Sequence, residues 1–163
     1  MASLLRKPFS ALTSLTQPPR PGSPGFALWK RLTGLNTTVF RLSGGRLLGT
    51  YDGNPVLLLH HVGRKSGEAR VTPLIYVEDG EDLVIVGSMG GTPKHPAWFL
   101  NLTAAPDAEV ELRGGRREVR ARVADAGERE RLWPLVVEHY PAFATYQGRT
   151  EREIPVVILS RRR

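Results

Sequence analysis

Residues 56–77 read VLLLHHVGRKSGEARVTPLIYV, two apolar β-type runs on either side of a glycine-bracketed basic turn. Glycine permits the left-handed backbone conformation that lets neighbouring N–H groups converge on one point. Arg64, Lys65 and Arg70 add positive charge at the same place. An ordinary hairpin needs glycine and polar residues but not three cations. The turn therefore predicts a site for a phosphate or a carboxylate, and a solvated basic hairpin is the alternative that the motif by itself leaves open.

Length and composition narrow the class of protein. A chain of 163 residues is long enough for one domain with a substantial core. The absence of cysteine excludes disulfides and thiolate chemistry and is consistent with a reducing compartment. No apolar stretch approaches the length of a membrane span. We therefore expect a cytoplasmic protein.

Positive charge is concentrated in the N-terminal part. Residues 1–50 hold seven Lys and Arg residues and no Asp or Glu, whereas the two signs balance in residues 51–163, so the net charge of +7 belongs to the first part. Leucine and phenylalanine recur near helical spacing in residues 1–16, and residues 17–25 include four prolines. We expect residues 1–25 to be a basic, proline-rich tail, either an amphipathic helix at an anionic membrane surface or a disordered arm. Residues 26–163 are expected to form a single domain.

Apolar periodicity and turn residues predict a mainly β domain. We expect helices at 26–42, 96–104 and 126–139, the last with a capping box of Asp125 and Glu128 and a kink at Pro134. We expect strands at 47–50, 55–62, 70–78, 82–88, 108–113, 116–124 and 154–160, several of them joined by tight turns. Strands joined by hairpins favour an antiparallel sheet that closes into a small barrel, with helices outside it or plugging one end.

Residue spacing argues against three kinds of catalytic site. The four histidines show no metal-ligand spacing, and the neighbours His60 and His61 point to opposite faces of a strand, so we expect no metal site. No G-x-S-x-G elbow is present, and no carboxylate lies in an apolar run where burial would raise its pKa. Hydrolase and glycosidase chemistry therefore have no support in the sequence.

Three aromatic residues, Tyr140, Phe143 and Tyr146, follow the last predicted helix. Packing in the core is the commoner role of such residues. The small residues between them also leave room for a planar ligand, in which case the three rings form a lid or wall over it.

These motifs together resemble the deazaflavin-dependent nitroreductase family, whose members use coenzyme F420, an 8-hydroxy-5-deazaflavin. The resemblance covers roughly residues 26–160 in the same order and spacing. It rests on Asn36, 41–46, 55–59, 63–67, Arg70, 73–74, 79–80, 87–91, 96–102, 140–141, 146–147, Thr150, Arg152 and 154–156. It implies an α+β, mainly β fold: an antiparallel split β-barrel, FMN-binding-like, with flanking helices.

The resemblance also implies a cofactor that is flat at one end and highly anionic at the other, which suits the basic turn. The residues implied to bind it are Arg64, Lys65, Ser66, Arg70, Pro73, Leu74, Ser88, Met89, Gly90, Pro96, Ala97 and Trp98. The first four would hold the phosphate and the polyglutamate tail, and the next five would lie along or beside the ring. The last three would open a helix whose N-terminal amides can face an anion or a ring oxygen. The substrate side would be lined by Tyr140, Phe143 and Tyr146.

The implied reaction is hydride transfer from the reduced coenzyme to a quinone-like or nitro-containing acceptor, for which the protein supplies position and electrostatics. If a proton donor is needed, Ser88, Tyr140 and Tyr146 are the implied catalytic candidates. His60-His61 stands where relatives often have small polar residues, and Phe99 where they often have tyrosine. These two departures leave the acceptor undefined.

Three alternatives stay open at this point. The same barrel could bind FMN, or the protein could carry the coenzyme without catalysis. A nucleic-acid-binding module is the third, against which the charge-neutral folded part and the absence of a nucleic-acid motif argue. We expect a monomer with no nucleic-acid partner, and contact of the tail with the inner face of the cell membrane is a further hypothesis.

Overall fold

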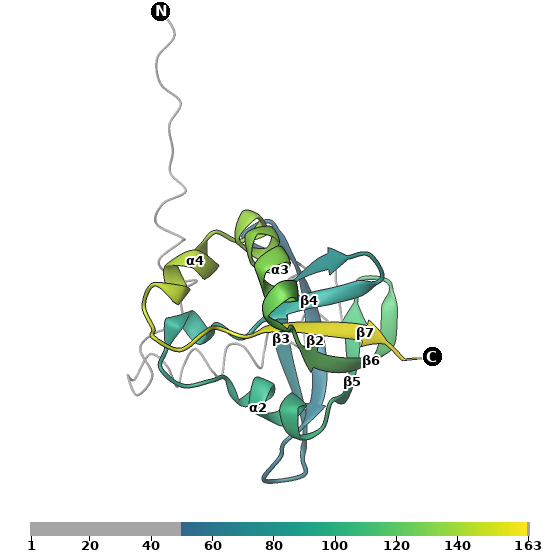
Figure 1. Cartoon of the computed structure of the whole chain (residues 1–163). Coiled ribbons are helices and arrows are strands. Elements are labelled where there is room, and N and C mark those ends of the chain that lie inside the picture. The colour runs from purple at the N-terminus through teal and green to yellow at the C-terminus, as the bar shows by residue number, and fades with distance from the viewer. Residues whose placement is uncertain (1–49, 163) are drawn as a thin grey trace, which may run out of the picture.

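The structure is a computed structural model and describes residues 50–162 (Figure 1). The predicted tail at 1–25, the helix at 26–42 and most of the strand at 47–50 lie outside these residues. The strands are β1 (Thr50–Tyr51), β2 (Asn54–Val62), β3 (Ala69–Asp79), β4 (Asp82–Val86), β5 (Asp107–Leu112), β6 (Gly115–Val123) and β7 (Val156–Arg161). The helices are the 3-10 helix η2 (Met89–Gly91) and the α-helices α2 (Ala97–Ala104), α3 (Ala126–His139) and α4 (Ala142–Gln147).

Six of the strands close into an antiparallel barrel. The order β2-β3-β4-β7-β6-β5 returns to β2, because Leu58 lies opposite Glu111 and His60 lies opposite Glu109 on β5. Within residues 50–162, the two residues of β1 pair with the start of β2 alone. Every pairing is antiparallel. The structure thus confirms the antiparallel split β-barrel expected from the sequence.

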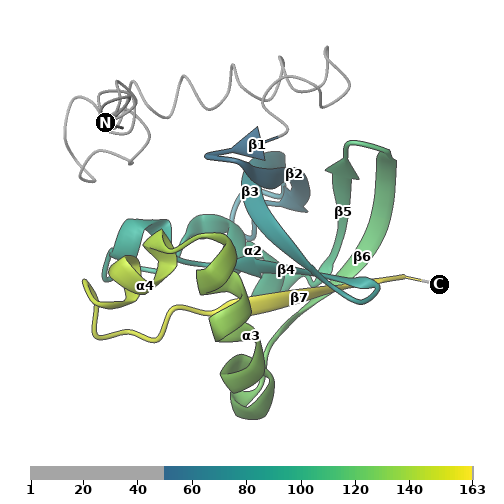
Figure 2. The ribbon, with the colours of Figure 1, turned by 90° about the horizontal axis from the view of Figure 1, so that it is seen from above.

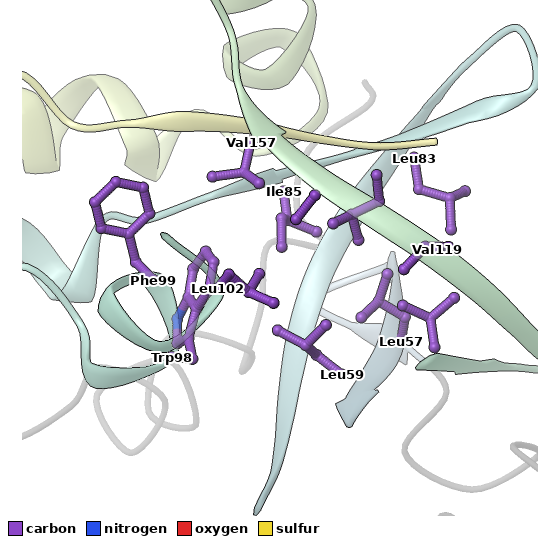
Figure 3. Close-up of a cluster of buried hydrophobic side chains, with 12 residues drawn as sticks. Leu57, Leu59, Leu83, Ile85, Trp98, Phe99, Leu102, Val119 and Val157 are labelled. Atoms are coloured by element: carbon purple, nitrogen blue, oxygen red, sulfur yellow. The ribbon is translucent and has the colours of Figure 1, made fainter. Parts of the chain in front are cut away.

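Alternation along the strands fills the barrel interior with apolar side chains. Helix α2 adds three side chains to this core, of which Trp98 and Leu102 lie beside the strand residues and Phe99 lies at the edge of the cluster in Figure 3. The buried core cluster consists of Leu57, Leu59, Leu83, Ile85, Trp98, Phe99, Leu102, Val110, Val119, Ala121, Val157 and Leu159. Full burial of one such large side chain contributes about 1.5–3 kcal/mol. The contribution of α2 to this cluster holds the helix firmly against the barrel.

A second cluster lies on the outer face of β4 and β7. Leu132 and Val136 of α3 and Phe143 and Tyr146 of α4 are buried there, against strand residues such as Ile158. Helix α3 begins with the predicted capping box, in which Asp125 accepts from the Glu128 N–H at 2.9 Å and Glu128 accepts from the Asp125 N–H at 3.0 Å. Pro134 lies inside α3, which continues through it to His139.

The β2–β3 turn lies beside α2, and α2 and α4 lie on the same side of the barrel, away from the β5–β6 hairpin (Figures 1 and 2). The corner that contains η2 packs against α4. This side therefore gathers most of the segments that the sequence predicts for the site.

Two strand boundaries, the end of β4 and the start of β7, differ from the prediction by two residues, and one helix was missed. Helix α4 forms over residues 142–147, where no helix was predicted, and its Phe143 and Tyr146 supply the apolar burial that holds it. β4 ends at Val86 and β7 begins at Val156, both shorter than predicted. Pro155 has no N–H to donate, so the strand ladder stops there, although the Gly87 N–H still reaches the Pro155 carbonyl at 2.9 Å. None of the described helices is long and apolar enough to cross a membrane.

Candidate functional site

The basic turn between β2 and β3 closes through two backbone hydrogen bonds. The Gly63 N–H donates to the Glu68 carbonyl at 2.8 Å, and the Gly67 N–H donates to the Gly63 carbonyl at 2.7 Å. Gly67 has a φ of 69°, which glycine adopts without strain. A Cβ at position 63 would lie 2.6 Å from the Ser66 hydroxyl and 3.0 Å from Arg70 Nε. Glycine at 63 therefore lets Ser66 and Arg70 fold across the turn.

The cations of this turn differ in their partners. Arg70 Nη2 donates to Glu68 Oε2 at 3.0 Å and to the Ser66 hydroxyl at 3.4 Å. Arg64 and Lys65 are exposed, and among residues 50–162 neither forms an ion pair. An exposed pair of uncompensated cations on a fixed backbone turn suits an anionic ligand. The residues present therefore fit the phosphate and carboxylate groups of the implied cofactor.

Helix α2 anchors the turn through Asn101. Its Oδ1 accepts from the Arg64 backbone N–H at 3.1 Å and lies 3.5 Å from Arg64 Nη1, while its Nδ2 lies 3.1 Å from His61 Nδ1. His61 Nε2 lies 3.0 Å from the Thr72 hydroxyl. Burial, and then the charges of Arg70 and His60, lower the pKa of His61, so the imidazole is neutral at pH 7.

Sequence reasoning missed the role of Asn101. One signal was present in the sequence: Asn101 is the single polar residue in the stretch Trp98-Phe99-Leu100-Asn101-Leu102. A polar side chain buried among apolar ones needs a hydrogen-bond partner, and here the partner must come from a distant part of the chain. His60 and His61 do point to opposite faces, as predicted. His60 binds Glu111 Oε2 at 3.2 Å on the outer side of the barrel closure.

The corner of Ser88, Met89 and Gly90 has an unusual backbone conformation. Met89 and Gly90 have φ values of 45° and 67°, and Gly91 follows with a φ of 78°. A Cβ on Gly91 would collide with the Tyr146 carbonyl oxygen, so glycine permits the close approach of α4. Ser88 is 9% exposed. The corner is therefore a fixed backbone feature rather than a loose loop.

Arg152 holds this corner from the other side. Its Nε donates to the Thr92 carbonyl at 2.8 Å, and its Nη2 donates to the Gly87 and Ser88 carbonyls at 3.2 and 2.9 Å. Its Nη1 lies 3.4 Å from His95 Nδ1. Burial lowers the pKa of Arg152, and burial followed by the charge of Arg152 lowers that of His95. Arg152 belongs to the segments that carry the resemblance, but the sequence does not reveal that it binds these carbonyls.

The predicted residues on β3 and α2 point in different directions. Pro73 is half-buried opposite Leu58 of β2, whereas Leu74 and Trp98 pack in the barrel core. Ala97 is exposed in the first turn of α2, whose first N–H groups have no acceptor within the helix. The Trp98 side chain is 7% exposed, so its ring is not available to a ligand. Helix α2 can therefore contact a ligand through these N–H groups, next to the exposed basic turn.

The three predicted substrate-side aromatics form a cluster with Tyr51 of β1. The Tyr140 ring lies 5.0 Å from Phe143, 6.5 Å from Tyr146 and 6.1 Å from Tyr51, measured between ring centroids. Phe143 and Tyr146 are buried and Tyr140 is half-buried. Burial, and then the hydrogen bond to Tyr146 with further contributions from Tyr51, raise the pKa of Tyr140 well above its usual range.

Two surface hollows lie outside the basic turn, the η2 corner and the aromatic cluster. One of about 450 Å³ is lined by Arg129, Trp133 and Glu153 together with the start of α3, and one of about 220 Å³ lies between α2 and β6. Neither is lined by a residue predicted for the site. We place the candidate site at the basic turn and the η2 corner on their chemistry, since size alone does not identify a ligand site.

The sequence pattern of the F420H(2)-dependent quinone reductases matches residues 31–161, which is most of the chain. The chain belongs to this family. An F420H(2)-dependent quinone reductase of Mycobacterium tuberculosis is 39% identical over 136 residues, which cover 81% of this chain and 91% of that protein. The family resemblance read from the sequence is thereby confirmed.

Two solved structures of family-like chains agree with this assignment. One, an F420-H2 dependent reductase, is 41% identical, with a TM-score of 0.61 and coverage of 65% of this chain and 94% of that one. The other is described as a domain-swapped dimer; it is 39% identical, with a TM-score of 0.61 and coverage of 76% of this chain and 98% of that one. The expectation of a monomer therefore finds no support in this relative.

Proposed function

We propose that this family member transfers a hydride from reduced coenzyme F420 to a quinone. The observation that carries the proposal is the pair of uncompensated cations, Arg64 and Lys65, on a turn fixed to α2 by Asn101. The bound coenzyme supplies the hydride, and the chain supplies position and electrostatics. Nitro-containing acceptors are a second substrate class, which the sequence resemblance suggests.

The anionic end of the coenzyme would be held at the turn. Arg64 and Lys65 offer charge, Ser66 offers a hydroxyl, and Arg70 stands behind them, already oriented by Glu68. Charge-assisted hydrogen bonds of this kind are about twice as strong as neutral ones. The first N–H groups of α2, at Ala97, add the positive end of a helix dipole to the same side of the barrel.

The ring end would lie beside the η2 corner and β3. We assign Ser88, Met89 and Gly90 to the border of the ring and Pro73 to its side. Arg152 keeps this corner fixed from behind. A rigid corner lowers the entropy cost of holding two reactants in a reactive orientation.

The acceptor would meet the aromatic cluster. Tyr140 is half-buried, whereas Phe143 and Tyr146 are buried, and its raised pKa keeps the phenol protonated even well above neutral pH. It can donate a hydrogen bond to an acceptor oxygen without losing its proton. We propose Tyr140 first, then Tyr146 and Ser88, as residues that orient the acceptor or pass it a proton.

A fluorescence titration of the purified full-length protein with coenzyme F420, with FMN titrated in parallel, tests the cofactor. Saturable binding of coenzyme F420 and not of FMN supports the proposal. Binding of FMN alone would make FMN the cofactor in place of coenzyme F420. Binding of neither compound would refute the proposed function. A coenzyme carrier is distinguished by turnover: oxidation of the reduced coenzyme with menadione as acceptor, followed by absorbance, supports a reductase, and tight binding without turnover supports a carrier.

Assembly and location are separate proposals. The domain-swapped relative makes a dimer the form to test, by light scattering during size-exclusion chromatography. A cytoplasmic protein with peripheral contact to an anionic membrane is proposed on the charge distribution alone, since residues 1–50 hold all of the net charge.

A further inference from the structure

Beneath the basic turn, side chains from three elements form one continuous hydrogen-bonded chain. It runs from the Thr72 hydroxyl on β3 to His61 on β2 at 3.0 Å, and from His61 to Asn101 on α2 at 3.1 Å. It ends at the backbone N–H of Arg64, 3.1 Å from Asn101 Oδ1. His61 and Asn101 are 6% and 4% exposed, so water does not compete freely for these groups.

The donor at the Arg64 end of this chain fixes the orientation of the Asn101 amide and the tautomer of His61. The Arg64 backbone N–H can only donate, so the Asn101 amide must present its oxygen to the turn and its NH₂ to His61. His61 Nδ1 must therefore accept, and Nε2 carries the hydrogen that is donated to the Thr72 hydroxyl. This arrangement requires a neutral imidazole.

We propose that His61 is a positioning residue for cofactor binding: its neutral imidazole sets the orientation of the Asn101 amide, which holds the Arg64 N–H and the basic turn in their anion-binding conformation. The identity of the ligand as coenzyme F420 rests on the proposed function, whereas the hydrogen-bond chain is observed independently of it. Protonation of His61 Nδ1 would place two donors against each other. The Asn101 amide would then have to turn over, and the Arg64 N–H would lose its acceptor.

The charged groups around His61 favour the neutral form. On β3, Arg70 lies directly opposite His61, and His60 is its neighbour on β2; the charges of both lower its pKa. Its hydrogen-bond partner on α2 is the uncharged Asn101. The Glu68 carboxylate of the turn is engaged by Arg70, and among the described residues no carboxylate pairs with His61. Cofactor affinity is therefore expected to be full at neutral pH and to fall in acid, as His61 takes up a proton.

Two substitutions separate the two ends of the imidazole. In His61→Asn, the amide oxygen can take the place of Nδ1 as the acceptor for Asn101, and the residue no longer titrates. In His61→Gln, the longer amide reaches toward Thr72 and leaves Asn101 without a defined acceptor. His60→Asn is the matched control, because His60 binds Glu111 on the other face of the strand.

The first measurement is the dissociation constant for coenzyme F420 at pH 7.5 and pH 5.5, by fluorescence titration of the full chain. At pH 7.5 we expect His61→Asn and the His60→Asn control to bind within about two-fold of the wild type, and His61→Gln to bind about five- to ten-fold more weakly, as for the loss of one hydrogen bond. Between the two pH values the wild type should weaken more than His61→Asn. Titration of the ligand itself is common to both proteins and cancels in this comparison. Equal weakening of the two overturns the inference.

The second measurement needs no ligand. NMR of the free protein should show His61 as the Nε2–H tautomer. The Arg64 amide should exchange with solvent at least ten-fold faster in His61→Gln than in the wild type or His61→Asn. Unchanged Arg64 exchange in His61→Gln, or a hydrogen on Nδ1, overturns the inference whatever the cofactor. The predicted exchange pattern in a protein that binds no coenzyme F420 supports the positioning role and refutes the proposed function, so the two failures are distinct.

Discussion

Arg152 Nη2 donates a 2.9 Å hydrogen bond to the carbonyl oxygen of Ser88, which is 64 residues earlier in the chain. The same guanidinium reaches the carbonyls of Gly87 and Thr92. One cation thereby fixes both ends of the corner that carries η2. Its planar array of donors is what three carbonyls in different directions require.

Replacement of Arg152 by Lys should loosen the η2 corner. An ammonium group cannot reach all three carbonyls, and each partly buried carbonyl left without a donor is destabilising. We expect a loss of about 2 kcal/mol in the free energy of unfolding, measured by urea denaturation, and weaker coenzyme binding. Arg113→Lys, at an exposed residue in the β5–β6 turn, is the control and should change neither. A wild-type urea midpoint for Arg152→Lys would contradict the role given to this residue.

Gly91→Ala tests the close approach of α4. Gly91 has a φ of 78°, and its new Cβ would collide with the Tyr146 carbonyl oxygen. Gly80 has a similar φ of 64° in the β3–β4 turn, with nothing near its Cβ position. Gly80→Ala should therefore cost about 1 kcal/mol from backbone strain, and Gly91→Ala distinctly more. Denaturation curves of the two variants give the loss in the free energy of unfolding for each. Equal losses would show that α4 can move away from position 91 at no cost in stability.

Arg64→Ala and Lys65→Ala should each weaken coenzyme F420 binding by about 1–3 kcal/mol, as for the loss of a charge-assisted contact. Folding stability should change little, because both side chains are exposed. Arg113→Ala is the matched control, since Arg113 also lies in an exposed glycine-containing turn. Fluorescence titration measures all three. If the Arg64→Ala, Lys65→Ala double variant bound coenzyme F420 with wild-type affinity, the turn would be a solvated basic hairpin and not part of the cofactor site.

The contribution of Glu128 to stability, at the N-terminus of α3, should be lost in acid. Arg122, whose two Nη atoms lie 2.6 Å from the Glu128 carboxylate, and the Asp125 N–H lower the pKa of Glu128 to about 2. The Glu128 carboxylate takes up a proton less readily in the folded protein than in the unfolded chain, so its ionised form stabilises the fold. This stabilisation is complete above the ordinary pKa of 4.5 and is lost as the pH falls through about 2. Glu128→Gln should be less stable than the wild type at pH 7, with a difference that shrinks steadily between pH 4.5 and pH 2. A difference independent of pH over that range would exclude the charge as its source.

Deletion of residues 1–25 tests the basic tail. We expect unchanged turnover with menadione, because the candidate site is built from residues 64–146, and weaker sedimentation with anionic liposomes, because the deletion removes Arg6, Lys7 and Arg20. Neutral liposomes are the control. Loss of turnover on deletion would assign the tail to the active site instead.

The strands and the basic turn were predictable because local chemistry determines them. Alternating apolar residues, the Asp79-Gly80 turn and the Asp125 capping box each act within a few residues, and the structure has all three. The helix at 142–147 was missed, because its stability comes from burial of Phe143 and Tyr146 against distant strands.

The same distinction applies to the candidate site. The charge of Arg64 and Lys65 is visible in the sequence, whereas their support comes from Asn101, which is 37 residues later than Arg64. The direction of a side chain also depends on the fold, as Trp98 shows by packing in the barrel core. Sequence patterns can thus indicate which groups contact a ligand, but the contacts that hold those groups come from tertiary structure.

The place of β7 in the barrel has a consequence for biosynthesis. β7 pairs with β4 on one side and β6 on the other, so each of these two strands keeps one open edge in a nascent chain until Val156 and the residues after it leave the ribosome. Open edges recruit other strands, and pairings between distant segments form slowly. The interval before β7 arrives is therefore when this protein is most exposed to aggregation, and chaperone demand during translation should fall once that strand is in place.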